Sequence, residues 1–343
     1  MKTSKQHINA RCVDMNTDKP TVISTFCGCG GSSLGYHMAG YKELLAVDFD
    51  PEAVKAFKLN FDVPIWNADV TQLTGKQILD FVGLQKGELD VFDGSPPCQG
   101  FSTQGKREVC DDRNDLVNHY IRLVSEIQPK VFIMENVSGM VKGTMKGRFK
   151  EFILHMKAMN YNVSAKLLNA KWLGVPQSRE RMIFIGVRSD LNLNPVFPKP
   201  INKLITVKDT IDDLGNTMIP EINHIWVDEK TKNTLNYKRA LTVKQGENYK
   251  PLRKRIKENE PLPTITTGGM KIGMAYMLGN SSCHYKYTRT LSIRELARCQ
   301  SFPDSFKFYN DLVQSPGRIG NSVPPVMMKH ISETVKNEIL SKI

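Results

Sequence analysis

The sequence predicts an α/β protein with a doubly wound, mostly parallel sheet and a second, smaller domain. Strand-like and helix-like segments alternate over residues 20–189, and polar residues cluster where the strands end. This pattern is typical of a parallel sheet with helices on both faces. The alternation is lost at a group of prolines that begins at Pro195. We therefore expect one domain from residues 1–189 and 305–343, and a small domain from residues 190–304.

Each element has a local signal in the sequence. Apolar runs of four to seven residues predict buried strands, and apolar residues at helical spacing predict helices that pack on the sheet. The expected strands are residues 21–26, 44–47, 64–68, 89–92, 131–134, 162–168 and 182–187. The expected helices are residues 32–38, 116–127, 146–159 and 326–340. The spacing of Ser292 and Glu295 matches a capping box, which predicts that a hinge helix of the small domain begins there.

Composition excludes some classes of protein. No apolar run among the 343 residues approaches the roughly 20 residues that span a bilayer. The seven cysteines are scattered and form no Cys-x-x-Cys pair, so neither a zinc site nor a disulfide framework is expected. A reducing, cytoplasmic compartment fits this cysteine usage.

The net charge of +12 is concentrated in one stretch. Ten lysines and arginines lie between Lys230 and Lys257, against one acid, Glu247. A solvated lysine-rich face is the simple interpretation. The local concentration favours contact with a polyanion such as a nucleic acid.

The most informative segment surrounds Cys98. The apolar strand at residues 89–92 runs almost directly into Pro96 and Pro97, which restrict the backbone before the cysteine. Cys98 therefore follows the carboxyl end of a strand, where open α/β sheets bind ligands. A thiol there is a nucleophile if its surroundings favour the thiolate, and is otherwise structural.

A glycine turn follows the first strand. Gly28, Gly30 and Gly31 lie between that strand and a helix, the opening unit of many nucleotide-binding sheets. Asp48 follows the second strand, at the distance typical of a carboxylate that binds ribose hydroxyls. Asp69 ends the third strand region.

These segments, in this order, resemble the cytosine-5 DNA methyltransferase family over about residues 20–330. The matching segments are Phe26–Gly31, Pro96–Gln99, Glu135–Val137, Gln177–Arg181, Arg289–Glu295 with Phe302–Asp304, and Gly320–Val323. The resemblance implies a Rossmann-like, S-adenosylmethionine-dependent methyltransferase fold and a small target-recognition domain. It also implies methyl transfer from S-adenosylmethionine to carbon 5 of a cytosine in a specific duplex DNA sequence, with S-adenosylhomocysteine as the second product.

The resemblance also implies catalytic roles. The thiolate of Cys98 would add to carbon 6 of the cytosine, which makes carbon 5 nucleophilic. Glu135 would carry or share a proton at ring N3, which favours a partly desolvated pocket. Arg179 would orient Glu135, and Arg181 would contact the O2 atom of the base. A cytosine inside a duplex cannot reach Cys98, so it must be flipped out of the helix.

Binding residues follow from the same resemblance. The donor-lining positions would be Phe26, Gly28, Gly30, Gly31, Asp48, Phe49, Asp69, Pro96, Leu116, Asn321, Ser322 and Val323. The DNA-contacting positions would be Ser102, Gln104, Lys106, Arg113, Thr264, Gly268, Gly269 and Lys271. The chain departs from the family at Ser24, where an aspartate is usual, and at Asp48, where a glutamate is usual.

Three other functions are consistent with parts of the pattern. A transfer RNA cytosine-5 methyltransferase would carry a Cys-Phe-Thr element, which the sequence lacks. A DNA-binding relative without activity would not need Cys98 and Glu135 together. A nicotinamide-dependent oxidoreductase is suggested by the glycine turn alone. We expect instead a monomeric prokaryotic or phage modification enzyme that is associated with the nucleoid and paired with a restriction endonuclease.

Overall fold

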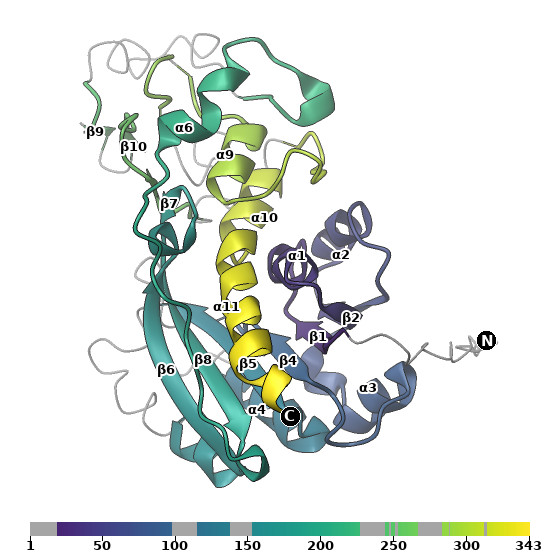
Figure 1. Ribbon diagram of the computed structural model, residues 1–343. Helices are drawn as coiled ribbons and strands as arrows, with labels where there is room; N and C mark the ends of the chain where they lie inside the picture. The colour runs from purple at the N-terminus through teal and green to yellow at the C-terminus, as the bar shows by residue number, and fades with distance from the viewer. Residues whose placement is uncertain are drawn as a thin grey trace, which may run out of the picture.

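The computed structural model describes residues 19–97, 115–137, 153–226, 244–246, 248–250, 253–266, 283–287, 289–311 and 314–343. Within this part of the chain, seven strands form one sheet in the order β3-β2-β1-β4-β5-β8-β6 (Figure 1). They are β1 (Thr21–Thr25), β2 (Lys42–Asp48), β3 (Ile65–Asn67), β4 (Val91–Gly94), β5 (Val131–Val137), β6 (Tyr161–Asn169) and β8 (Glu180–Arg188).

The sheet is parallel from β3 through β5, and β8 runs antiparallel to both β5 and β6. The predicted mostly parallel sheet is confirmed. The reversal at β8 is not visible in its sequence, because a buried apolar run fits either direction. It has a consequence for the site: the carboxyl ends of β1, β2, β4 and β5 and the first residues of β8 all meet at one edge.

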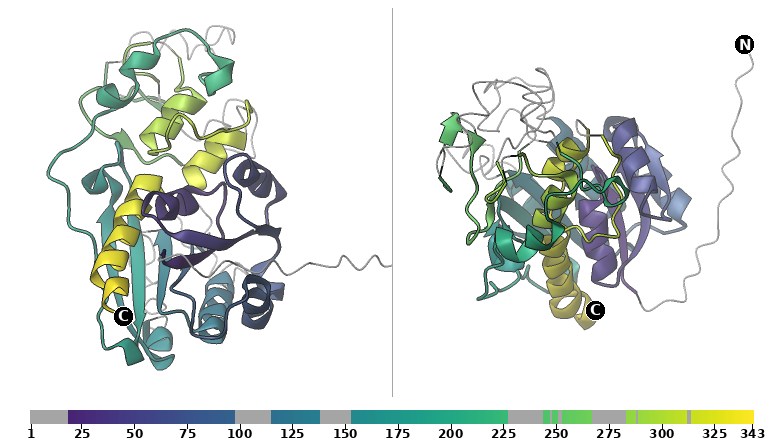
Figure 2. Two further views of the ribbon diagram at one scale, coloured as in Figure 1. Left: turned by 45° about the vertical axis from the view of Figure 1, so that its right-hand side comes forward. Right: turned by 90° about the horizontal axis from the view of Figure 1, so that it is seen from above.

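Helices cover both faces of the sheet (Figure 2). The helices are α1 (Gly31–Met38), α2 (Pro51–Lys58), α3 (Gly75–Val82), α4 (Asp115–Ile127), α6 (Val207–Ile211), α9 (Ile293–Cys299), α10 (Gln314–Asn321) and α11 (Pro325–Glu338). Side chains of α3 and α4 fill one apolar layer against the sheet. Side chains of α1 and α11 fill the layer on the opposite face, although these helices come from the two ends of the chain. The sheet is therefore doubly wound, as predicted.

The small part of the molecule lies beyond the carboxyl edge of the sheet (Figure 1). It contains α6, α9, α10 and two short pairings, β7 (Gln177–Ser178) with β11 (Leu262–Pro263) and β9 (Asn248–Lys250) with β10 (Arg253–Lys254). Its apolar cluster continues past residue 304 to Phe306, Phe308 and Ile319. The predicted domain boundary at residue 304 stays a prediction, and the packing shows no break there.

The predicted capping box begins α9. The Glu295 backbone N–H donates to the Ser292 hydroxyl at 3.0 Å, and the Ser292 N–H donates to the Glu295 carboxylate at 2.8 Å. That carboxylate also accepts two hydrogen bonds of 2.8 Å from Arg289. Although burial opposes its charge, hydrogen bonds from Arg289 and His284 lower the pKa of Glu295 to about 2. An ionised Glu295 thus organises the segment that leads into the helix.

A buried aspartate joins α1 to the centre of the sheet. Asp93, on β4, accepts hydrogen bonds from the hydroxyls of Ser32 at 2.7 Å and Tyr36 at 3.1 Å. Its register partner on β1 is Ser24, whose buried hydroxyl oxygen has no hydrogen-bond partner. Burial is the main cause that raises the pKa of Asp93 to about 7. The buried carboxyl group of Asp93 is therefore held by α1, on the strand next to Ser24.

Asp93 should make stability depend on pH. Because its pKa is raised in the folded state, its protonated form stabilises the fold below about pH 4, and this contribution is lost as the pH rises through about 7. We expect the free energy of unfolding of Asp93→Asn to rise by about 4 kcal/mol relative to that of wild type between pH 4 and pH 8. Urea unfolding at several pH values measures this difference, and a difference that does not change with pH would contradict the assignment.

Candidate active site

The glycine loop after β1 packs directly on the C-terminal part of the chain. A Cβ atom at Gly31 would lie 2.3 Å from the carbonyl oxygen of Val323, so only glycine fits there. The Cys29 Sγ lies 3.1 Å from the Ser322 Oγ. The structure therefore brings together the predicted donor-lining residues of the loop with Ser322 and Val323.

Asp48 shapes this loop from the end of β2. Its carboxylate accepts the Gly28 N–H at 2.8 Å and the Asp50 N–H at 2.9 Å. Burial is the largest cause that raises the pKa of Asp48, while the two backbone hydrogen bonds lower it. Each carboxylate oxygen can accept a second hydrogen bond, so Asp48 can hold the loop and still bind a ligand hydroxyl.

An exposed aromatic ring lies next to Asp48. The side chain of Phe49 is 69% exposed, an unusual state for so large an apolar group. Its backbone is fixed, because the Asn67 amide donates to the carbonyls of Asp48 at 3.1 Å and Phe49 at 2.8 Å. The helix α1 begins nearby at Gly31, and its N-cap residue, Gly30, has no side chain to cap it. An apolar ring, a carboxylate and free helix N–H groups together fit an adenosine ligand with a charged tail.

Three further residues that are predicted to line the donor lie in the described part of the chain. Asp69 is exposed and caps a short helical turn by accepting the Thr71 N–H at 2.9 Å. Leu116 is half-buried at the start of α4. Pro96 is buried, and its carbonyl accepts the Asn136 side-chain amide at 3.4 Å. Asn136 thereby connects β5 to the segment that leads into Cys98.

Glu135 and Arg181 form an ion pair at the carboxyl edge of the sheet. The Arg181 Nε lies 2.6 Å from the Glu135 Oε1, and both side chains are largely buried. Because β8 runs antiparallel to β5, Arg181 lies opposite Val137 and reaches back to Glu135. The sequence predicts this orienting contact for Arg179, but in the structure Arg181 makes it, and the guanidinium of Arg179 bonds other groups.

Arg179 has a different set of partners. Its guanidinium is buried and donates to the carbonyl oxygens of Ile265 at 3.0 Å and Gly320 at 2.9 Å. Burial is the main cause that lowers the pKa of this guanidinium, Arg181 lowers it further, and Glu135 opposes the shift. Arg179 thus joins two distant backbone segments.

Several predicted residues lie outside the described part of the chain. They are Cys98, Ser102, Gln104, Lys106, Arg113, Gly268, Gly269 and Lys271. Thr264 is described, and its hydroxyl donates to the Ser178 carbonyl at 2.8 Å.

Three of the four described cysteines make poor nucleophiles. Cys27, Cys29 and Cys299 are buried, and burial is the main cause that raises the pKa of each thiol, to about 11 for Cys29. A thiolate is the reactive form, so these three groups are inert at neutral pH. This result favours a cysteine elsewhere in the chain as the nucleophile.

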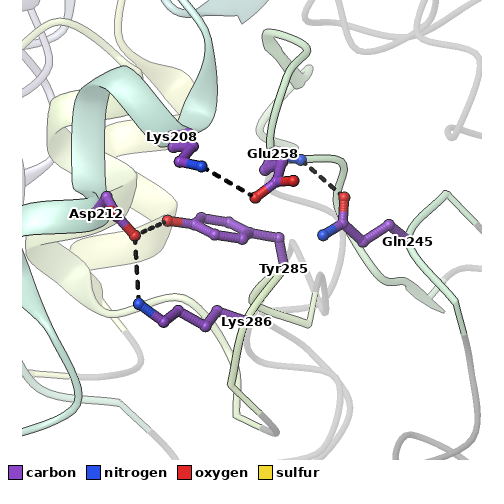
Figure 3. A pocket seen from close by; sticks show the side chains of 6 residues that line it. All are labelled: Lys208, Asp212, Gln245, Glu258, Tyr285 and Lys286. Carbon is purple, nitrogen blue, oxygen red and sulfur yellow. Dashed lines mark hydrogen bonds and ion pairs between the residues drawn. The ribbon is translucent and has the colours of Figure 1, made fainter.

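A polar pocket of about 250 Å³ lies in the small part of the molecule (Figure 3). Its lining residues are Lys208, Asp212, Gln245, Glu258, Tyr285 and Lys286. Lys208 faces Glu258 at 3.7 Å, and Lys286 faces Asp212 at 3.7 Å. These charges balance within the pocket, and none of the predicted site residues lines it. Across the ranges described above, no cluster of metal-ligating side chains occurs, and no helix is long and apolar enough to cross a membrane.

The strand order, the glycine loop after β1 and the carboxylate after β2 define a Rossmann-like methyltransferase. Residues 20–337 match the family described as C-5 cytosine-specific DNA methylase. The chain belongs to this family and is a DNA cytosine-5 methyltransferase. The family implies S-adenosylmethionine as its methyl donor.

Individual relatives agree with this result. The Type II methyltransferase M1.HphI of Haemophilus parahaemolyticus is 34% identical, over 92% of this chain and 86% of its own length. The Type II methyltransferase M.MthTI of Methanothermobacter thermautotrophicus is 33% identical, over 95% of this chain and 98% of its own. A solved prophage-encoded DNA modification methyltransferase of Escherichia coli superposes with a TM-score of 0.77 at 28% identity, covering 94% of this chain and 100% of that one.

Some residues that shape the site give little signal in the sequence. Gln177 and Asn136 belong to recognised motifs, but nothing in their spacing shows that they bond to segments far away in the sequence. Asp93 directly precedes the Cys98 segment, and its polarity inside an apolar strand was the available signal. Arg255 was counted in the basic stretch, yet it donates to the carbonyls of His284 at 3.3 Å and Tyr285 at 3.2 Å.

The basic stretch can now be tested with a matched control. We expect the double change Lys250→Gln and Lys254→Gln to weaken DNA binding and to lower the salt slope by about two, because each phosphate contact contributes about one. Arg255→Gln should instead lower stability and leave the slope unchanged, since its guanidinium holds backbone carbonyls. Duplex DNA titrations at four salt concentrations measure both. An unchanged slope in the double variant would show that Lys250 and Lys254 lie off the DNA.

Proposed function

We propose that this DNA cytosine-5 methyltransferase acts through a covalent bond between Cys98 and carbon 6 of a flipped-out cytosine in a specific duplex sequence. Glu135 acts at ring N3, and Arg181 holds its carboxyl group in place. The observation that supports this proposal best is the ion pair of 2.6 Å between Glu135 and Arg181, at the sheet edge where the strand before Cys98 ends.

The roles follow from the chemistry of cytosine. Carbon 5 is a weak nucleophile until the Cys98 thiolate adds to carbon 6 and breaks the aromatic ring system. Glu135 holds a proton at N3, which accommodates the electron pair displaced by that addition. After carbon 5 is methylated, its proton leaves to a base, and the Cys98 sulfur is expelled as the double bond re-forms. Asn136 supports the geometry, because it bonds the carbonyl of Pro96.

S-adenosylmethionine fits the residues around the glycine loop and supplies an electrophilic methyl group when bound. Asp48 would hold the ribose hydroxyls, and the exposed ring of Phe49 would stack on the adenine. Asp69 would accept a hydrogen bond from the adenine amino group. The loop backbone and the start of α1 would meet the charged tail of the donor.

The substrate we propose is duplex DNA rather than transfer RNA. Two relatives named above are Type II methyltransferases, enzymes of restriction-modification systems, and we propose a partner restriction endonuclease with the same recognition sequence. The chain would then act in the compartment that holds the DNA of the cell. We propose a monomer as the functional unit.

A mechanism-based trap tests the nucleophile. DNA that carries 5-fluorocytosine should form a covalent adduct with the wild-type protein, because fluorine cannot leave carbon 5 as a proton does. Cys98→Ala should form no adduct, whereas Cys110→Ala, a cysteine change in the same stretch of sequence, should trap DNA as wild type does. Denaturing gel electrophoresis with labelled duplex gives the result. An adduct with Cys98→Ala would refute the assignment.

A double-mutant cycle tests whether Arg181 acts through Glu135. We expect Arg181→Met and Glu135→Gln each to lower the single-turnover methylation rate by roughly 10²-fold or more, the range of general acid catalysis. Because both changes damage the same carboxyl group, the double variant should be about as slow as the slower single variant. Rate losses that multiply would mean that Arg181 has an independent role, such as the contact with O2 first assigned to it.

A further inference from the structure

Two side chains hold both polar backbone groups of Ile265. The Gln177 Oε1 accepts the Ile265 N–H at 3.0 Å, and the Arg179 Nη1 donates to the Ile265 carbonyl at 3.0 Å. The hydroxyl of Thr264 donates to the carbonyl of Ser178, the residue between them. Three consecutive residues therefore fix Thr264 and Ile265, which belong to the predicted DNA-recognition part of the chain.

The same two side chains also reach the donor-lining segment. The Gln177 Nε2 donates to the Gln300 Oε1 at 2.5 Å, and the Gln300 Nε2 donates to the Ser322 carbonyl at 2.6 Å. The Arg179 Nη2 donates to the Gly320 carbonyl at 2.9 Å. Two series of hydrogen bonds thus connect Ile265 to residues 320–322. One passes through Gln177 and Gln300, and the other passes through Arg179 alone.

This connection continues to the glycine loop. The Ser322 Oγ lies 3.1 Å from the Cys29 Sγ, and the Ser322 Cβ would lie 2.8 Å from a Cβ atom added at Gly31. A shift of residues 320–322 must therefore move the loop or be blocked by it. The atoms at this contact are closely packed, so no free volume is present to accommodate such a shift.

Burial makes the connection rigid. Gln177 and Gln300 are fully buried, and Arg179 is 2% exposed. Water cannot replace a broken hydrogen bond there, so each loss leaves an unsatisfied polar group. The arrangement of Ile265 relative to Ser322 is therefore held to one geometry.

We propose that Gln177 and Arg179 are positioning residues that couple DNA binding at Thr264–Ile265 to donor binding at Gly320–Ser322. This inference rests on the proposed function and on the sequence-based prediction that Thr264 contacts the DNA and that Asn321 and Ser322 line the donor site. A recognition segment that is correctly seated on DNA stabilises the donor-binding geometry, and the bound donor stabilises the recognition segment by the same factor.

The test measures donor affinity with and without DNA. The probes are S-adenosylhomocysteine, which permits no turnover, and a duplex that contains the sequence methylated by the wild-type enzyme, identified by base-resolution sequencing of DNA from expressing cells. Wild type should bind S-adenosylhomocysteine more tightly when the duplex is present. Gln177→Leu should reduce this enhancement roughly fivefold or more, because it removes the link to Ile265 and the link to Gln300 together.

A matched control separates coupling from stability. Tyr161→Phe removes another buried hydrogen bond, from the tyrosine hydroxyl to the Pro129 carbonyl at 2.6 Å, at the opposite edge of the sheet. It should lower stability yet keep the wild-type enhancement. If Gln177→Leu does not fold, Gln300→Leu can replace it, because this change removes the hydrogen bonds from Gln300 to Gln177 and Ser322. It should reduce the enhancement of donor affinity to the same extent.

Several results would overturn the inference. These are a wild-type protein with no enhancement, a glutamine variant with the full enhancement, or an equal loss in Tyr161→Phe. A wild-type protein that fails to methylate DNA or to form the 5-fluorocytosine adduct would refute the proposed function instead. The two failures are thus distinguishable.

Discussion

The ion pair between Glu135 and Arg181 depends on the one strand that runs against the others. A parallel strand beside β5 would bring its carboxyl end, with different residues, to this edge of the sheet. Because β8 is antiparallel, its first residues lie there, and the loop before it passes directly into the small part of the molecule. Glu135 and the Thr264–Ile265 segment are therefore held by the two ends of the same short stretch, residues 177–181.

This stretch also shows how a buried cation can be held without an acid. Arg179 is surrounded by carbonyl dipoles, and its Nε has no hydrogen-bond partner among the described residues. Such an arrangement is costly, since a buried charge gains most from an opposite charge. Glu135 is engaged with Arg181 instead. Burying Arg179 thus lowers stability, but its hydrogen bonds fix the positions of Ile265 and Gly320 relative to each other.

Local sequence patterns predicted the strands, several of the helices that pack on the two faces of the sheet, and the capping box at Ser292. Each of these features depends on residues that are close together in the sequence. The motif spacing also located the carboxyl-edge residues. It could not assign the two arginines, since residues two apart on an extended chain point the same way and differ only in distant partners. Ile265 and Gly320 decide the role of Arg179, and their proximity is a property of the folded chain. The same holds for the partners of Gln177.

The contact between Gly31 and Val323 joins an early and a late segment of the sequence, so it can form only late in synthesis. Translation places the glycine loop outside the ribosome long before residues 320–338 exist. Until α11 has been made, α1 lacks the helix that covers its apolar side, and the loop lacks one wall. The packing around the glycine loop is thus completed only after residues 320–338 have been synthesised. A chain that ends before residue 320 would lack this wall of the loop, even with its central sheet formed.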